Sequence, residues 1–302
     1  MISYKYRATG RKSCRAMENR EYRVDEDIKL IRAMTGLTQE DMAVRMGVST
    51  VTLNRWENKE NSLSPENLKR VYTLAHELGI PLNSIKEQFY KEEGSSDLKI
   101  LFHGAKEALY GKISPDKSDK INDFGRGFYM GESFRQAALF VSNYPAPSVY
   151  VASFNTRALH GVEYKVDREW LMTIAVHRGR LSNVIDSKKE EAIRQKVREA
   201  DYVLAPIADN RMYQIIDTFI AGEITDEQCR HALAATNLGR QYVAVSKKAM
   251  DGIHVLERCY LCDAEKSAYT ESRKNEITEA DSKVKAARIK YRGKGKYIDE
   301  LL

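Results

Sequence analysis

A series of short amphipathic segments between residues 24 and 80 restricts the fold more than any other feature. Apolar residues recur there at the three- and four-residue spacing of helices. Capping side chains begin several of the segments and glycines end several, as expected for helices joined by tight turns. The caps are Thr38, Ser49 and Ser64, and the glycines are Gly36, Gly47 and Gly79. The pattern predicts an all-α module in this part of the chain.

Two of these predicted helices are joined by a short turn that contains Gly47, which is the arrangement of a helix-turn-helix. The line from Leu37 to Ser49, with Trp56-Glu57-Asn58 after it, resembles the Xre/Cro repressor family. The resemblance implies that Gln39 contacts a phosphate of DNA. It also implies a set of residues that face the major groove, namely Ser49, Thr50, Thr52 and Arg55.

The residue types at that predicted face suit DNA. Short hydroxyl side chains approach base edges, and arginine pairs with guanine through two hydrogen bonds. Phosphate neutralisation would supply most of the affinity, so binding is expected to weaken with added salt. An alternative stays open, in which the module has lost DNA binding and serves dimerisation or partner docking.

A second pair of motifs follows this module. The apolar run Leu98–Phe102 predicts a buried strand that ends in His103-Gly104, and Gly125-Arg126-Gly127-Phe128-Tyr129 comes later. Together they resemble the ADP-ribosyltransferase superfamily, in its diphtheria-toxin and poly-ADP-ribose-polymerase branch. Gln241-Tyr242-Val243 stands where that branch has Glu-Tyr-Ile or Glu-Tyr-Val. The line Ala205–Met212 is similar to a bacterial domain family of the same superfamily.

The resemblance implies a pocket for NAD. His103 would hydrogen-bond a ribose hydroxyl, and the Gly104 backbone would pair with the nicotinamide amide. Tyr129 and Phe140, the latter on a helix predicted over Ser133–Ser142, would sandwich the nicotinamide ring. The implied catalytic residues are His103, Tyr129 and Gln241. The implied cofactor-binding residues are His103, Gly104, Arg126, Gly127, Phe128, Tyr129 and Phe140, with Arg126 at the phosphates.

Two positions depart from the family pattern. Gln241 replaces a glutamate, and hydrogen bonds between neutral groups are worth about 0.5–1.5 kcal/mol against about 1.5–3 kcal/mol for those to a charged group. The loss should slow the transfer and leave mono-ADP-ribosylation, so Gln241→Glu is expected to gain activity. Ala137 stands where the branch often has a serine that bonds the nicotinamide amide. Asp209 is a candidate base for an acceptor, although its loop has an equally good structural interpretation.

The formal net charge is +6, and lysines and arginines crowd residues 1–23 and 283–296. This favours contact with nucleic acid, although solvated tails remain the alternative interpretation. The sequence has no run of 18 apolar residues and no signal-peptide core, so we expect a cytoplasmic protein without membrane contact. Cys259 and Cys262 have no second pair at zinc-site spacing, so no metal site is predicted.

The predicted fold class is α+β, in which an all-α helix-turn-helix domain precedes an ADP-ribosyltransferase-like split β-sheet domain with helices. The predicted boundaries give a basic N-terminal segment at 1–23 and the helix-turn-helix at 24–91. A polar linker at 92–97 follows, then the NAD-binding domain at 98–262 and a charged, basic tail at 263–302.

These observations lead to one preferred function and one alternative. The preferred function is a mono-ADP-ribosyltransferase that uses NAD to modify a macromolecule, with nucleic acid favoured over protein. Such a fusion resembles a toxin-antitoxin or phage-defence component whose helix-turn-helix binds its own promoter, with an antitoxin protein and a second copy of the chain as candidate partners. The alternative is a transcriptional regulator whose C-terminal domain binds NAD or ADP-ribose without catalysis.

Overall fold

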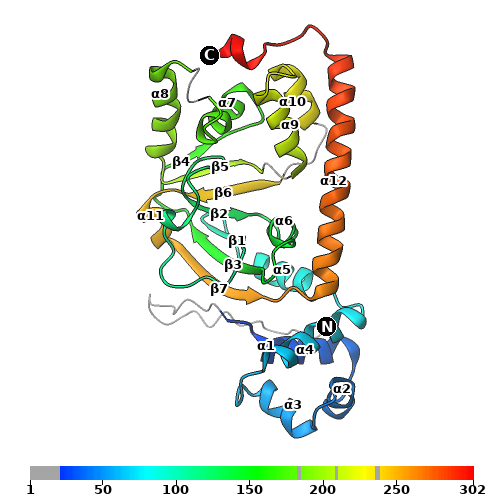
Figure 1. The fold of residues 1–302 in the computed structure, drawn as a ribbon. Coiled ribbons are helices and arrows are strands. Elements are labelled where there is room, and N and C mark those ends of the chain that lie inside the picture. Colours follow the sequence, from blue (N-terminus) through cyan, green and yellow to red (C-terminus); the bar gives the residue numbers. More distant parts are fainter. Residues whose placement is uncertain (1–20, 182–184, 208–209, 235–238) are drawn as a thin grey trace.

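The computed structural model describes residues 21–181, 185–207, 210–234 and 239–302 (Figure 1). A helical module lies at one end, and a mixed sheet with helices around it forms the rest, which confirms the predicted α+β class. The helices of the module are α1 (Val24–Thr35), α2 (Gln39–Met46), α3 (Thr50–Glu57), α4 (Pro65–Glu77) and α5 (Leu82–Glu92).

Local capping sets the bounds of these helices. The Thr38 hydroxyl accepts a hydrogen bond from the Asp41 N–H at 3.1 Å, and the Asp41 carboxylate accepts one from the Thr38 N–H at 3.2 Å, which completes a capping box before α2. Ser49 and Ser64 cap α3 and α4 in the predicted way. Gly36 ends α1 at φ 71°, a left-handed conformation that glycine adopts without steric cost.

The module is docked directly on the sheet domain. Tyr260, which follows the last strand, stacks on Tyr72 of α4 with ring centroids 4.7 Å apart. Tyr90 of α5 packs in an apolar core that also contains residues of the sheet. The predicted linker is short and ordered, because the Ser95 N–H donates to the Leu98 carbonyl at 2.8 Å. The position of the module is therefore fixed by packing.

The sheet has the order β4-β5-β6-β2-β1-β3-β7. Its strands are β1 (Leu98–Ala105), β2 (Phe128–Gly131), β3 (Ser148–Asn155), β4 (Gly161–Glu163), β5 (Tyr202–Pro206), β6 (Arg240–Ala244) and β7 (Ile253–Cys259). β4 and β5 are parallel, and the other neighbours are antiparallel. β1 pairs with β3 along its whole length, whereas the described register between β1 and β2 holds only Phe102 opposite Gly131. The sheet therefore has its weakest joint at β1 and β2.

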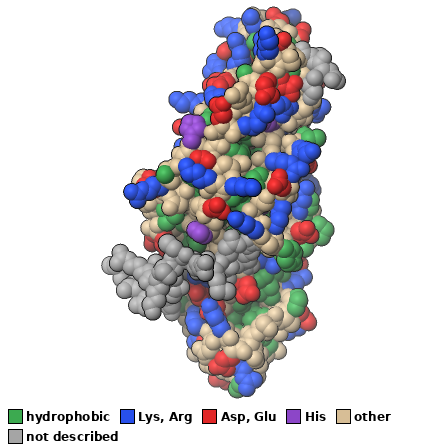
Figure 2. All heavy atoms as spheres, turned by 90° about the vertical axis from the view of Figure 1, so that its left-hand side faces the viewer, with side chains coloured by type: hydrophobic (Ala, Val, Ile, Leu, Met, Phe, Trp, Pro, Cys, Tyr) green, Lys and Arg blue, Asp and Glu red, His purple; other side chains and the backbone are tan. Residues whose placement is uncertain are grey.

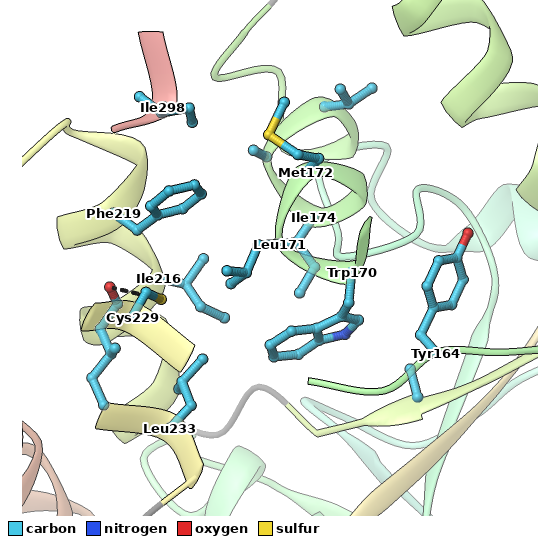
Figure 3. Packing of buried hydrophobic residues seen from close by; sticks show 14 of the residues in the cluster. Tyr164, Trp170, Leu171, Met172, Ile174, Ile216, Phe219, Cys229, Leu233 and Ile298 are labelled. Carbon is cyan, nitrogen blue, oxygen red and sulfur yellow. Dashed lines mark hydrogen bonds between the residues drawn. The ribbon is translucent and has the colours of Figure 1, made fainter. Parts of the chain in front are cut away.

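Helices cover this sheet from several sides. They are α6 (Phe134–Val141), α7 (Arg168–His177), α8 (Ser187–Arg198), α9 (Asn210–Ile220), α10 (Asp226–Ala234) and α11 (Lys247–Asp251). Figure 3 shows the largest core, in which Trp170 and Leu171 of α7 face Ile216 and Phe219 of α9. Leu233 of α10 closes the same core. This packing holds α7 and α9 beside the β5–β6 half of the sheet.

The segment predicted to be a charged tail folds back onto the rest of the chain. Helix α12 (Asp263–Lys290) runs along the molecule from the helix-turn-helix module to α10 (Figure 1). Asp263 pairs with Lys69 of α4 at 2.7 Å, and Asp281 accepts a hydrogen bond from Gln214 of α9 at 2.6 Å. A short 3-10 helix (Ile298–Leu301) then places Ile298 in the core of Figure 3.

Candidate functional site

The predicted DNA-contacting residues share an open face of the helix-turn-helix module. Ser49, Thr50 and Arg55 are exposed and Thr52 is half-buried, all at or within α3. Figure 1 places α2 and α3 at the end of the module that is remote from the sheet. The body of the protein therefore leaves room for a duplex against α3.

Gln39 has a second task besides its predicted phosphate contact. Its amide nitrogen donates to Glu57 at 2.5 Å, and Glu57 in turn accepts from Arg32 at 2.7 Å. These bonds tie the start of α2 to the end of α3 and to α1. The chain holds the Gln39 side chain in place before any DNA arrives.

His103 bridges the weak joint between β1 and β2. Its Nδ1 lies 2.7 Å from the Tyr129 carbonyl oxygen, and its ring stacks on Phe128 with centroids 4.1 Å apart. Burial lowers the pKa of His103 to about 4, opposed by the bond to the Tyr129 carbonyl. The ring is therefore neutral near pH 7. Because a carbonyl only accepts, Nδ1 carries the proton and Nε2 is left as an acceptor.

Tyr129 is held at the same joint by the motif that precedes it. Its hydroxyl donates to the Gly125 carbonyl at 2.7 Å and accepts from the Phe124 N–H at 3.1 Å. The ring is half-buried and packs against the core that contains Trp170. The loop before β2 therefore fixes the orientation of this ring.

Two glycines of the motifs are required by packing within the chain. A Cβ on Gly104 would lie 2.6 Å from the Ala137 carbonyl oxygen of α6. A Cβ on Gly127 would lie 2.6 Å from a methyl group of Val243 on β6. Such close approach permits only glycine. The glycines therefore bring α6 and β6 against the strands that carry His103 and Tyr129.

Gln241 lies on β6 opposite Gly131 of β2 and is buried. Its amide nitrogen is 3.2 Å from the Pro206 carbonyl oxygen and 3.3 Å from the Asp123 carboxylate. Asp123 also accepts two bonds from Arg178, at 2.9 Å and 3.1 Å. A carboxylate therefore stands beside Gln241, at the position where the resemblance to ADP-ribosyltransferases implies a glutamate. Burial raises the pKa of Asp123, and the Arg178 guanidinium opposes that shift.

The other predicted pocket residues are placed differently. Phe140 is 52% exposed on α6, so its ring is not packed against the Tyr129 joint in the way a closed sandwich requires. Arg126 bonds the Asp116 carbonyl in the preceding loop, which occupies one of its guanidinium nitrogens. Asp209 lies outside the described residues.

Two family models match the chain once its fold is in view. Residues 28–85 match a model described as Helix-turn-helix, and residues 99–255 match one described as Protein of unknown function (DUF3990). The second match spans more than half of the 302 residues. The chain belongs to the DUF3990 family. Neither model describes an ADP-ribosyltransferase, and no curated protein or solved structure matches.

The first match identifies the N-terminal module as a helix-turn-helix, a DNA-binding fold, fused to the DUF3990 domain. A buried ionic cluster joins the two, and its charged residues lie just beyond the matched ranges. Lys86 of α5 donates to Asp27 of α1 at 2.5 Å and to Glu257 of β7 at 2.6 Å. The hydroxyls of Tyr72 and Tyr90 complete it, donating to Asp27 at 2.6 Å and to Glu257 at 2.7 Å.

In this cluster, called the boundary cluster below, Lys86 forms ion pairs with both Asp27 and Glu257. Burial and Glu257 raise the pKa of Asp27 to about 6, although Lys86 opposes them. Burial favours the neutral form of Lys86, but the two carboxylates outweigh it and raise the pKa of this lysine well above its usual value. The ammonium is therefore retained between the domains. This contact is not predictable from the sequence, because Lys86 looks like any polar residue of an amphipathic helix.

Asp123 and Arg178 were also missed as site residues. Asp123 begins the line that contains the two glycines, but its partner lies at the end of α7, far away in the sequence. A polar cavity of about 300 Å³ opens beside them, lined by Ile121, Asn122, Asp123, Arg178, Arg180 and Asp217. The only local signal was a carboxylate immediately before an apolar residue and a Gly-x-Gly.

Thiols and metal ligands contribute little to this site. Cys229, Cys259 and Cys262 are buried free thiols, and burial raises the pKa of each. Cys259 ends β7 and Cys262 caps α12. Within the described ranges, no three His, Cys, Asp or Glu side chains gather as metal ligands would. No described helix is long and apolar enough to cross a bilayer.

Proposed function

We propose that the DUF3990 domain binds NAD at the β1–β2 joint and transfers a single ADP-ribose to a macromolecule. The helix-turn-helix would bind DNA, including the promoter of its own gene, and regulate the fused domain. The observation that carries the proposal is the bond from His103 Nδ1 to the Tyr129 carbonyl at 2.7 Å. It brings the two motif residues together at the joint where β1 and β2 share a single described pair, and it fixes the tautomer of the histidine.

The donor and acceptor set at this joint fits a ribose diol. Neutral His103 presents Nε2 as an acceptor, and Gln241 presents Oε1, because its nitrogen already donates to Asp123 and Pro206. No described hydrogen bond engages either acceptor atom, and His103 is only half-buried. Two neighbouring hydroxyl groups are donors and match two such acceptors.

The remaining residues supply orientation and charge. The Tyr129 ring, held through its hydroxyl, offers a face on which a flat ring stacks for about 0.5–1.5 kcal/mol. NAD, when bound, supplies a labile bond between ribose and nicotinamide, whose cleavage leaves positive charge on the sugar. Acceptors held in place around that sugar stabilise such charge more than mobile water does. This chain provides them on β1 and β6.

The alternative is a regulator that binds NAD or ADP-ribose without turnover. One observation favours it: Gln241 itself is neutral, and the nearest carboxylate, Asp123, is engaged by Arg178. Binding and turnover are separable in one experiment. Calorimetry with NAD that shows heat of binding, together with no release of nicotinamide under any condition, would establish the alternative.

The enzyme proposal is tested by incubating the full-length protein with labelled NAD and either cellular nucleic acid or cellular protein. We expect nicotinamide release and label transfer, and a loss on the order of 100-fold in His103→Ala and Tyr129→Ala. His254→Ala on β7 is the matched control, because that histidine is exposed on the edge strand. Since the pKa of His103 is about 4, the rate should show no loss from this group as the pH falls from neutrality toward that value.

The choice of acceptor rests on the overall positive charge. Figure 2 shows lysine and arginine side chains interleaved with acidic ones over one face of the sheet domain, so charge on that face does not select nucleic acid by itself. We favour nucleic acid because the net charge is +6 and the fused module is a DNA-binding fold. Label found only in the protein fraction would reverse that preference.

The DNA role is tested with the upstream region of the gene in a gel-shift titration at several salt concentrations. We expect binding that weakens steeply with salt, and Arg55→Ala should weaken specific binding about 10- to 100-fold. Arg45→Ala is the control, because that exposed arginine lies in the last turn of α2 and outside α3. Binding that neither salt nor Arg55→Ala alters would favour the docking or dimerisation role.

A further inference from the structure

The Gln241 amide is held from the inside by two groups that accept hydrogen bonds. Its nitrogen donates to the Pro206 carbonyl at 3.2 Å and to Asp123 Oδ2 at 3.3 Å. A carbonyl and an ionised carboxylate have no hydrogen to donate. The nitrogen must therefore face them, and the amide oxygen must turn the other way.

Asp123 is in turn fixed by a second element. Its Oδ1 accepts from Arg178 Nε at 3.1 Å and from Nη2 at 2.9 Å. Paired bonds from a guanidinium to one carboxylate restrict both position and orientation. Both side chains are largely buried, with 11% of Arg178 and 3% of Asp123 exposed. Oδ2 is therefore left as the atom that addresses Gln241.

The negative charge that the ADP-ribosyltransferase pattern places at position 241 is found in this chain on the neighbouring residue Asp123. The family pattern places a carboxylate at the position of Gln241, and this chain places one a single hydrogen bond away. A glutamate at 241 would face the Asp123 carboxylate and the Pro206 carbonyl, with no donor between them. Like charges at such separation repel strongly in a buried site. This geometry reverses the expectation from the sequence that Gln241→Glu gains activity.

We propose that Asp123 and Gln241 act as one unit in which Asp123 is a positioning residue. Its carboxylate orients the amide so that Gln241 Oε1 accepts a ribose hydroxyl, and it supplies the negative charge that the family pattern places on glutamate. Arg178 holds the carboxylate in place. The assignment rests on the proposed NAD reaction and names a residue that neither the motif nor the family match assigns.

A purely structural role for Asp123 would be to join the loop before β2 to the end of α7. Asp217 provides a control for that role, because its carboxylate lies 3.4 Å from Arg178 Nη1, on the same guanidinium. No described bond links Asp217 to Gln241. Asp217→Asn removes a charge beside the same arginine and leaves the Gln241 amide untouched.

The experiment compares the full-length wild-type protein with Asp123→Asn, Gln241→Glu, the double variant and Asp217→Asn. For each, kcat and KM of nicotinamide release are measured beside the thermal unfolding midpoint. In Asp123→Asn, Arg178 retains the side-chain oxygen, so the new NH₂ faces Gln241 and forces its amide to rotate. We expect kcat to fall about 10- to 100-fold with a smaller change in KM, as for loss of one preorganised acceptor.

Gln241→Glu alone should lose kcat as well and lower the unfolding midpoint by roughly 5 °C. The double variant should recover most of both losses, because the NH₂ of an asparagine at 123 donates to a carboxylate at 241. Asp217→Asn should keep wild-type kcat. Full activity in Gln241→Glu, or a double variant no better than Asp123→Asn, would overturn the unit.

Failure of the proposed reaction is separable from failure of this inference. If the wild-type protein binds NAD but releases no nicotinamide, the enzyme proposal falls. The pairing is then decided by the unfolding midpoints alone. Recovery of the Gln241→Glu loss by Asp123→Asn supports the pairing, and additive losses refute it.

Discussion

Two buried clusters hold carboxylates away from water: the boundary cluster around Lys86, and the site cluster formed by Asp123, Arg178 and Gln241. They differ in whether a hydrogen-bonding atom is left for a ligand. At the boundary, Lys86 and two tyrosine hydroxyls donate to Asp27 and Glu257, and no atom of these side chains is among the described buried atoms without a partner. At the site, the partners of Gln241 engage only its nitrogen. The boundary cluster is closed, and the site cluster keeps one acceptor open.

The difference separates two uses of a buried charge. A closed cluster gains nothing from a ligand and instead penalises any displacement of the domains, because separation would strand its charges. An open cluster is preorganised by its inner bonds and completed from outside. The same chemistry therefore fixes the docking of the helix-turn-helix in one place and prepares a binding surface in the other.

Replacing Lys86, the cation at the centre of the closed boundary cluster, should strongly destabilise the folded protein. Lys86→Met leaves two buried carboxylates facing each other, and loss of one partner of a buried ion pair typically costs about 3–5 kcal/mol. We expect a fall of that size in the free energy of unfolding, measured by urea titration. This is the largest effect predicted for a single substitution in the molecule.

Two controls bracket this result. Lys91→Met on the same helix removes an exposed pair with Glu87 and should cost no more than about 1 kcal/mol. Arg178→Met in the open cluster should cost about 1.5–3 kcal/mol, since Asp123 keeps its bond from Gln241 and lines a polar cavity. Equal losses in all three variants would contradict the distinction between closed and open clusters.

The pH dependence of stability should sharpen the comparison. The folded pKa of Asp27 is about 6, above the usual value of 3.8, so the folded state binds this proton more tightly than the unfolded state. The contribution of Asp27 to stability is fully present below the unfolded pKa and is lost as the pH rises through about 6. Relative to Asp27→Asn, the wild-type protein should lose on the order of 2–3 kcal/mol across that range.

Denaturant titrations of both proteins at a series of pH values measure this difference directly. Lys86, Glu257 and Tyr72 all face Asp27, and the substitution leaves all three in place. The difference between the two proteins therefore isolates the carboxyl group. Parallel curves across the whole range would mean that Asp27 titrates in the folded state as it does in the unfolded one.

The helix-turn-helix could be predicted from sequence almost to its capping bonds. Gly36 and Thr38 act on residues three or four positions away, so their signal is local. The positions of His103 and Tyr129 on neighbouring strands likewise follow from short motifs.

The polar clusters were not predictable in the same way. Lys86 and Glu257 meet across 171 positions, and Arg178 and Asp123 across 55. No periodicity shows that a charged side chain will be buried, because the partners that make burial tolerable come from other elements. For the same reason, the prediction made from Gln241 alone took no account of the Asp123 carboxylate beside it.

The long helix α12 also fixes the separation between α4 of the helix-turn-helix module and α9 of the sheet domain. From Asp263, beside α4, to Asp281, beside α9, it rises about 27 Å at 1.5 Å per residue. That is about eight base-pair steps of B-DNA, and α3 lies farther away still (Figure 1). Bases held by α3 would lie at the opposite end of the molecule from α9. Under the proposed function, a promoter would act as a tether that raises the effective concentration of the domain around molecules assembled beside that promoter.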